Sequence, residues 1–162
     1  MNLSCQFKKS AEDSGLGLLY PDQSQTHIET LFVYPELQPL SGLSEKNREI
    51  MHGNLLLPLL DEEKRWLIFG DDQSGKTAFS KKLFLDAFAF GYTPLLIDGS
   101  RIKTSSLEKI VSNVISDIYP DVEATDFLRR KDLICIIDDF SKSKINESAK
   151  RKLITHGSLK NS

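Results

Sequence analysis

Eight consecutive residues have types and spacing suited to holding a phosphate group. They read Gly70-Asp71-Asp72-Gln73-Ser74-Gly75-Lys76-Thr77 and fit the pattern G-x-x-x-x-G-K-[ST]. Glycines at both ends let the backbone approach an anion closely, so that successive N–H groups converge on it. Lys76 adds a mobile charge for the terminal phosphates, and the Thr77 hydroxyl can ligate Mg²⁺. The stretch therefore predicts a nucleotide-phosphate site, with Lys76 also a candidate catalytic residue.

The segments on either side of this loop are those that such a site requires. Residues 66–69 (Trp-Leu-Ile-Phe) form a short bulky apolar run that predicts a buried strand. Residues 77–90 are long and apolar enough for a helix, whose N-terminus would point at the bound anion. Strand, loop and helix together give the context in which this motif binds phosphate.

A second acidic motif follows another apolar run. Residues 133–137 (Leu-Ile-Cys-Ile-Ile) predict a parallel strand covered on both faces, which leads directly into Asp138 and Asp139. This is the Walker B pattern, and it places Asp138 at the carboxyl edge of the sheet as a Mg²⁺ ligand. Asp139 is a candidate catalytic base that orients water, although Asp is shorter than the usual Glu. The alternative is that Asp139 is a turn or N-cap residue.

Other charged residues near these motifs are expected to be solvated. Asp71 and Asp72 occupy the middle of the loop, where side chains point outward, so that they are solvated or contact another part of the protein. Lys142 and Lys144 could approach a phosphate, but a solvated loop is the preferred interpretation for both.

The remaining pattern predicts an α/β domain preceded by a linker. We expect a lead-in or linker region over residues 1–60, loose over 1–26, and a nucleotide-binding domain over 61–162. Apolar periodicity, capping and turn residues indicate further elements. These are strands at 30–34 and 94–97, and helices at 45–51, 107–118, 124–131 and 146–156, with a capping box at 105–108.

Composition restricts the function classes. The net charge is -2 and the pI is about 5.9, which argues against a dedicated nucleic-acid binder. Two cysteines, Cys5 and Cys135, provide no disulfide framework and no C-x-x-C metal site. Apolar runs are too short to span a membrane. We therefore expect a cytoplasmic protein without direct nucleic-acid or membrane binding.

The combination GDDQSGKT, PLLIDGSRIK and LICIIDDFSKSKIN resembles the STAND class of signalling P-loop NTPases. More narrowly, it is similar to the NTPase region of bacterial antiphage-defence-type proteins in which a metallophosphoesterase precedes a STAND module. The segment 31–35 (Leu-Phe-Val-Tyr-Pro) looks like the link between those two domains. The resemblance implies a three-layer α/β/α parallel sheet, ATP bound by residues 70–77, Mg²⁺ at Thr77 and Asp138, and hydrolysis assisted by Asp139.

The resemblance also implies an incomplete core. P-loop domains of this subclass insert a fourth strand between the first and third, and that strand would follow residue 156. We therefore expect either the remainder of a longer STAND protein or a partner subunit to complete the sheet. A homo-oligomer is a separate option.

Three functions remain open at this point. The first is an ATP-binding switch with slow hydrolysis. Adenine is preferred to guanine because no N-K-x-D guanine motif is present. The second is a small-molecule kinase, because residues 96–101 (Leu-Ile-Asp-Gly-Ser-Arg) resemble the L-D-G-D-x-x-R stretch of adenylylsulfate kinases. The lack of the second Asp and the pair at 138–139 argue against it. The third is a scaffold that binds nucleotide without turnover.

Overall fold

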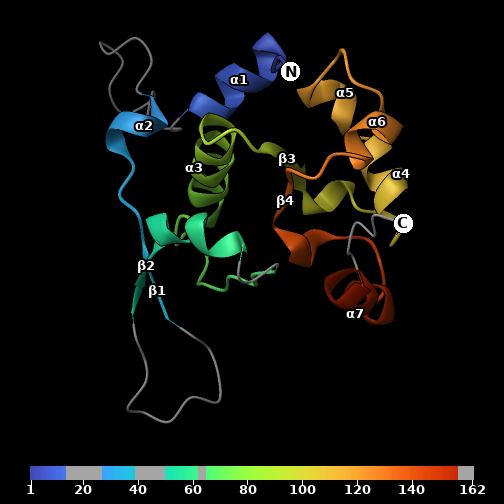
Figure 1. Ribbon diagram of the computed structural model, residues 1–162. Helices are drawn as coiled ribbons and strands as arrows, with labels where there is room; N and C mark the ends of the chain where they lie inside the picture. Colours follow the sequence, from blue (N-terminus) through green and yellow to red (C-terminus); the bar gives the residue numbers. More distant parts are fainter. Residues whose placement is uncertain (14–26, 39–49, 62–64, 157–162) are drawn as a thin grey trace.

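The computed structural model of the protein describes residues 1–13, 27–38, 50–61 and 65–156, and it has a mixed α/β architecture (Figure 1). Its α-helices are α1 (Cys5–Glu12), α2 (Ile28–Leu31), α3 (Lys76–Ala89), α4 (Leu107–Ser112), α5 (Ile115–Ile118), α6 (Ala124–Leu128) and α7 (Glu147–His156). Its strands are β1 (Glu36–Leu37), β2 (Met51–His52), β3 (Thr93–Asp98) and β4 (Leu133–Asp138). Short 3-10 helices are η2 (Gly53–Leu55), η3 (Pro58–Asp61), η4 (Gly99–Arg101) and η5 (Phe140–Lys142).

Strands β3 and β4 form a two-stranded parallel sheet at the centre of the fold. Their register pairs Thr93 with Leu133 and Asp98 with Asp138, so both strands end at the same edge. This confirms the predicted strands and their parallel pairing. Leu95 is fully buried, but Cys135 is exposed. The expectation that β4 would be covered on both faces is therefore wrong for its Cys135 side.

Helix α3 packs against both strands on one side of this sheet, while α4, α5 and α6 lie on the other side (Figure 1). Phe84 and Ala87 of α3 have no exposed surface. Gly91 follows the helix with a φ of 90°, the left-handed conformation that ends helices at glycine. The predicted helix is confirmed, but Phe90 is 73% exposed and does not belong to the buried face.

The helical region that follows β3 is broken into two pieces. Ser106 caps α4, its hydroxyl accepting from the N–H of Lys109, one residue later than the capping box predicts. The chain then leaves helical geometry at Val114 before α5 begins. The predicted single helix over 107–118 is therefore wrong in its continuity, but the apolar stripe is buried as expected. Its fully or largely buried members are Ile110, Val111, Val114, Ile115 and Ile118.

A buried tyrosine fastens this helical layer to the sheet. The Tyr119 hydroxyl donates to the carbonyl of Pro94 on β3 over 2.8 Å, and the side chain has no exposed surface. Burial raises the pKa of Tyr119, so it remains a neutral donor.

The amino-terminal residues that we expect to be loose begin with an ordered helix instead. The Ser4 hydroxyl caps α1 by accepting from the N–H of Phe7, and the Ser4 N–H donates to the carbonyl of Ile118 over 2.8 Å. Phe7 meets Phe84 of α3 edge-on, with ring centroids 5.0 Å apart. The prediction fails because polar composition hides a short amphipathic helix with Ala11 and Phe7 on its inner side.

Three further predictions are corrected or fall outside the described ranges. The predicted strand at 30–34 begins inside α2, and the chain pairs only later, in β1. The predicted helix at 45–51 lies mostly outside the described residues, but its last residue, Met51, belongs to β2. The predicted strand at 66–69 has no assigned strand geometry. No described helix is long and apolar enough to cross a membrane.

The Asp132 carboxylate in the turn before β4 is expected to make the free energy of unfolding depend on pH. Asp132 accepts from Arg130 and from the Thr93 hydroxyl, which is 2.8 Å away. The hydrogen bond from Arg130 is the main cause that lowers the pKa of Asp132. Because the folded-state pKa lies below the unfolded value of about 3.9, the stabilisation is present above that pH and is lost as the pH falls through the folded pKa.

We expect Asp132→Asn to lower the free energy of unfolding at pH 7 by at most about 1 kcal/mol, since the pair is partly exposed. The difference from the parent protein should shrink when urea unfolding is repeated at pH values below about 3.9. Asp126→Asn is the matched control, because Asp126 pairs with the exposed Arg129 at 3.5 Å. A difference for Asp132→Asn that persists unchanged at low pH would contradict the assignment.

Candidate functional site

The loop between residues 69 and 76 has a conformation set by its Lys and by two left-handed residues. The ammonium of Lys76 folds back to the carbonyls of Gly70, at 2.8 Å, and Asp71, at 2.5 Å. Gln73 has a φ of 63° and Gly75 a φ of 84°. The Ser74 N–H donates to the Asp71 carbonyl. These bonds close the loop on itself immediately before α3 begins at Lys76.

The loop leaves backbone donors available at the start of α3. Gly75 is the N-cap and supplies no side-chain acceptor to the helix. Within the described residues, the N–H groups of Gly75, Lys76 and Thr77 have no hydrogen-bond acceptor. A Cβ at Gly75 would meet no atom within 4 Å, so the space beside it is open. Unsatisfied N–H groups at a helix N-terminus, next to a lysine, fit an anion such as a phosphate.

The other predicted loop residues lie at the surface. Asp71, Asp72, Gln73, Ser74 and Thr77 are all exposed. Their exposure agrees with the expectation that the two carboxylates are solvated. It also leaves the Thr77 hydroxyl accessible from solvent.

The segment that precedes the loop is exposed rather than buried. Leu67 is 56% exposed and Phe69 is 69% exposed, and neither pairs with β4. The sequence prediction of a buried strand is therefore wrong for the described structure. Hydrophobicity and length were typical of a core strand, but a strand also needs a hydrogen-bonding neighbour, which the described residues do not provide.

Asp138 stands at the carboxyl end of β4, beside α3. One of its carboxylate oxygens lies 3.4 Å from the Ser80 hydroxyl. Thr77 makes no hydrogen bond with Asp138 in the described structure. Ser80 is therefore a site residue that sequence reasoning missed. Helical spacing could have indicated it, because Ser80 lies three residues after Thr77 and therefore on a similar face of α3.

Asp139 occupies a tight turn after β4. Its φ of 51° is left-handed, and it is the N-cap of η5 without a side-chain capping bond. Its carboxylate accepts from the ammonium of Lys142 over 2.6 Å, and this bond raises the pKa of Lys142. The alternative that made Asp139 a turn residue therefore has structural support, and Lys142 is paired rather than free.

Glycine at position 99 lets this turn approach the end of β3. A Cβ on Gly99 would lie 2.2 Å from the Asp139 carbonyl oxygen and 2.9 Å from the Cα of Phe140. No real side-chain carbon tolerates such a contact with backbone. The turn that carries Asp139 therefore rests directly on η4.

The polar residues after β3 are engaged in local bonds. Asp98 accepts from the Ser100 N–H over 2.8 Å, and this bond lowers the pKa of Asp98. Arg101 pairs with Asp117 over 2.6 Å and donates to the carbonyl of Asn113. Asp98 and Arg101 are the Asp and Arg of the stretch that resembles adenylylsulfate kinases, where the resemblance implies that they handle substrate. Here they stabilise η4 and its contact with α4 and α5.

The described residues include no group of three or more His, Cys, Asp or Glu side chains that could hold a metal ion. A Mg²⁺ ion would thus need phosphate oxygens and water in addition to Asp138, which is how this ion is usually bound. Comparison of the chain with protein-family models, curated proteins and solved structures finds no match.

Proposed function

We propose that the protein binds a Mg²⁺-nucleotide, with ATP preferred, at residues 70–77, and that it works as a nucleotide-dependent signalling switch with slow hydrolysis. The observation that carries this proposal is the closed loop, held by the Lys76 ammonium, which ends at the start of α3, where three N–H groups have no acceptor among the described residues. A lysine and a helix N-terminus are the two groups that stabilise a polyphosphate most directly.

The position of Asp138 supports the Mg²⁺ part of the proposal. Its contact with Ser80 brings a carboxylate to the helix that begins at the loop. Bound Mg²⁺ would supply charge neutralisation for the phosphates. Asp138 would hold the ion, directly or through water, and the exposed Thr77 hydroxyl is the second candidate ligand.

Among the described residues β4 pairs with β3 alone, so its other edge has no partner strand there, and this supports the switch class. In that class a further strand stands beside the strand that carries the acidic pair. We propose that the remainder of a longer STAND-type protein, or a partner subunit, completes the sheet. The same resemblance leads us to propose a role in bacterial antiphage defence. The cysteine content and the net charge lead us to propose a cytoplasmic location without direct nucleic-acid binding.

Titration calorimetry with ATP and Mg²⁺ tests the nucleotide site. We expect Lys76→Ala to weaken binding roughly 10- to 100-fold, because a hydrogen bond to a charged group contributes about 1.5–3 kcal/mol. Lys131→Ala is the matched control, since this exposed lysine precedes β4 at the opposite end of the strand. Equal binding by the parent protein, Lys76→Ala and Lys131→Ala would reject residues 70–77 as the site.

Phosphate release separates a slow ATPase from a scaffold. In this structure the Lys142 ammonium donates to the Asp139 carboxylate, which leaves that carboxylate less able to accept a proton from water. We therefore expect slow ATP hydrolysis. If Asp139 still acts as the base, Asp139→Asn should lower the rate about 100-fold or more, while ATP affinity stays within about twofold. An unchanged rate would remove Asp139 from the catalytic residues.

A further inference from the structure

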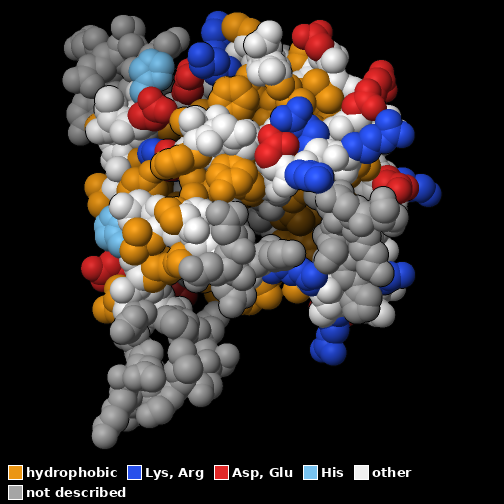
Figure 2. Space-filling view, in the orientation of Figure 1, with side chains coloured by type: hydrophobic (Ala, Val, Ile, Leu, Met, Phe, Trp, Pro, Cys, Tyr) orange, Lys and Arg blue, Asp and Glu red, His pale blue; other side chains and the backbone are white. Residues whose placement is uncertain are grey.

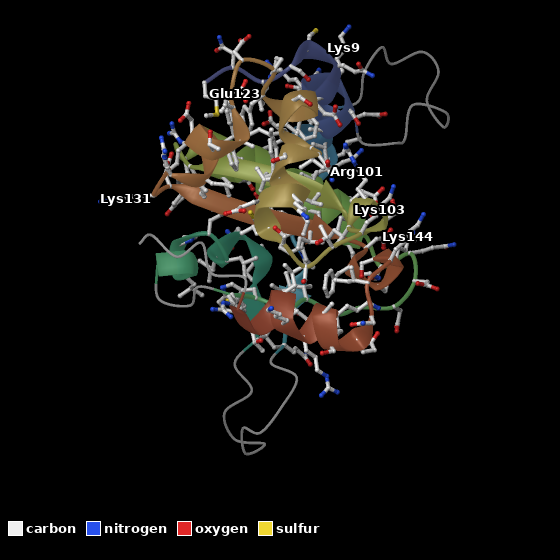
Figure 3. All side chains as sticks on the ribbon, turned by 90° about the vertical axis from the view of Figure 1, so that its right-hand side faces the viewer. Lys9, Arg101, Lys103, Glu123, Lys131 and Lys144 are labelled. Atoms are coloured by element: carbon white, nitrogen blue, oxygen red, sulfur yellow. The ribbon has the colours of Figure 1, made fainter. Side chains whose placement is uncertain are left out.

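A hollow lined by basic side chains lies beside the end of the parallel sheet, separate from residues 70–77. Its volume is about 450 Å³, and its lining residues are Ser100, Arg101, Lys103, Asn113 and Lys144. Seen from the side, Arg101, Lys103 and Lys144 follow one another down the same face of the molecule (Figure 3). On the face drawn in the space-filling view, basic and acidic side chains lie interspersed over its upper right part (Figure 2).

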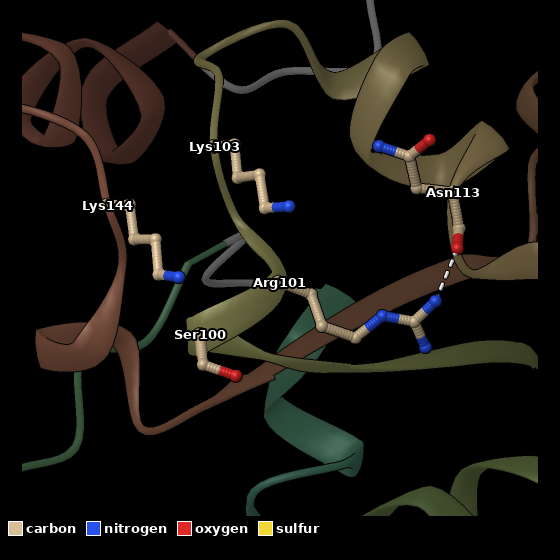
Figure 4. A pocket seen from close by; sticks show the side chains of 5 residues that line it. All are labelled: Ser100, Arg101, Lys103, Asn113 and Lys144. Atoms are coloured by element: carbon tan, nitrogen blue, oxygen red, sulfur yellow. Dashed lines mark hydrogen bonds between the residues drawn. The ribbon is translucent and has the colours of Figure 1, made fainter.

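The positive charge of this hollow is only partly neutralised. Arg101 is paired with Asp117, and the nearby Asp98 is bonded to the Ser100 N–H. Within the described part of the chain, Lys103 and Lys144 have no acidic partner. Figure 4 shows both lysine side chains extending into the same space, toward Ser100 and Arg101. Two ammonium groups at the same hollow, without an acidic partner among the described residues, create a positive potential that favours an anion there.

The backbone holds these lysines in fixed relative positions. The N–H of Lys144 donates to the carbonyl of Ile102 over 2.9 Å, and Ile102 itself is fully buried. Lys103 directly follows Ile102, so the two lysines project from neighbouring, hydrogen-bonded segments. This bond fixes the backbone from which both side chains start, so an anion has only the two side chains left to order.

The chemistry of the lining favours phosphate over carboxylate. The planar fork of Arg101, which suits a carboxylate, is already used by Asp117 and the Asn113 carbonyl. The remaining donors are two compact ammonium groups, the Ser100 hydroxyl and the Asn113 amide. Point charges and single donors suit the tetrahedral oxygens of a phosphate. The volume also lies within the usual range for small-molecule sites.

We propose that this hollow binds a small molecule that carries at least two phosphate charges, as a second anion site. It lies against the turn after β4, because Gly99 of η4 touches the backbone of Asp139. An anion that fixes Lys144 and η4 would therefore also fix the turn that follows Asp138. The site is independent of whether residues 70–77 bind ATP.

Calorimetry with pyrophosphate, performed on the full chain in the Lys76→Ala background, tests this site. We expect pyrophosphate to bind at one site in this background. Adding Lys103→Gln and Lys144→Gln together should weaken its affinity at least about 10-fold, and added NaCl should weaken it as well. The additional control Lys131→Gln should keep the parent affinity. Both lysines of the double variant are exposed, so its thermal unfolding should match the background protein.

Two further ligands identify the source of the phosphate. ADP binding more tightly than pyrophosphate would indicate a nucleotide ester, and the reverse would indicate an inorganic polyphosphate; either supports the hollow as the site. Citrate binding as tightly as pyrophosphate would overturn the phosphate assignment. Loss of pyrophosphate binding in Lys76→Ala alone, or equal weakening by Lys131→Gln, would overturn the second site while leaving the ATP proposal intact.

Discussion

Replacement of Phe84 by alanine is expected to lower the free energy of unfolding by about 3–5 kcal/mol. Phe84 has no exposed surface and meets the ring of Phe7 edge-on at 5.0 Å. The substitution removes apolar contacts on α3 and also the contact that holds α1 against it. Chemical denaturation monitored by circular dichroism measures the change.

The phenylalanine at the C-cap of the same helix provides the control. Phe90 is 73% exposed, so Phe90→Ala should change the free energy of unfolding by no more than about 0.5 kcal/mol. Similar costs for the two variants would contradict the packing of α3 on the sheet and the position of α1. Faster amide exchange in α1 of Phe84→Ala, but not of Phe90→Ala, would locate the effect.

The second large effect is expected for Gly99→Ala. The added carbon would lie 2.2 Å from the Asp139 carbonyl oxygen and 2.7 Å from its carbonyl carbon. Both atoms belong to backbone and cannot rotate away, so the turn after β4 must move. We expect a loss of about 3 kcal/mol in the free energy of unfolding, at the upper end for an overpacked position.

Gly91→Ala distinguishes a clash from simple loss of glycine. Gly91 has a φ of 90° but nothing within 4 Å of its added carbon, so only backbone strain of about 1–2 kcal/mol is expected there. If nucleotide binding depends on Asp138, Gly99→Ala should also weaken binding of ATP with Mg²⁺, whereas Gly91→Ala should not. If Gly99→Ala lowers the free energy of unfolding no more than Gly91→Ala does, the close approach of η4 to Asp139 is contradicted.

Local patterns along the chain predicted the central elements well. The helix after the loop, both parallel strands and the buried stripe of residues 107–118 all follow from apolar periodicity and from turn residues such as Gly91. The loop motif likewise predicted where Lys76 and the start of α3 would lie. Each of these features depends on residues that are close in sequence.

Features that depend on distant partners were not predicted. Residues 66–69 have the composition of a strand, but only a neighbouring strand could have buried Leu67 and Phe69. The order of α1 depends on its contact with Phe84, which is distant in sequence. The contact of Asp138 with Ser80 depends on the packing of α3 against β4, and the approach of Gly99 to Asp139 depends on the parallel register of β3 and β4. No local pattern contains that information.

Amide NMR during a titration with ATP and Mg²⁺ tests the central claim most directly. We predict that the largest shifts occur at Gly75, Lys76 and Thr77, whose N–H groups have no acceptor among the described residues, and that they disappear in Lys76→Ala. Smaller shifts at Ser80 and Asp138 would report the Mg²⁺ end of the site. Shifts confined to residues 100–103 and Lys144, or no shifts at saturating nucleotide, would contradict nucleotide binding by the loop.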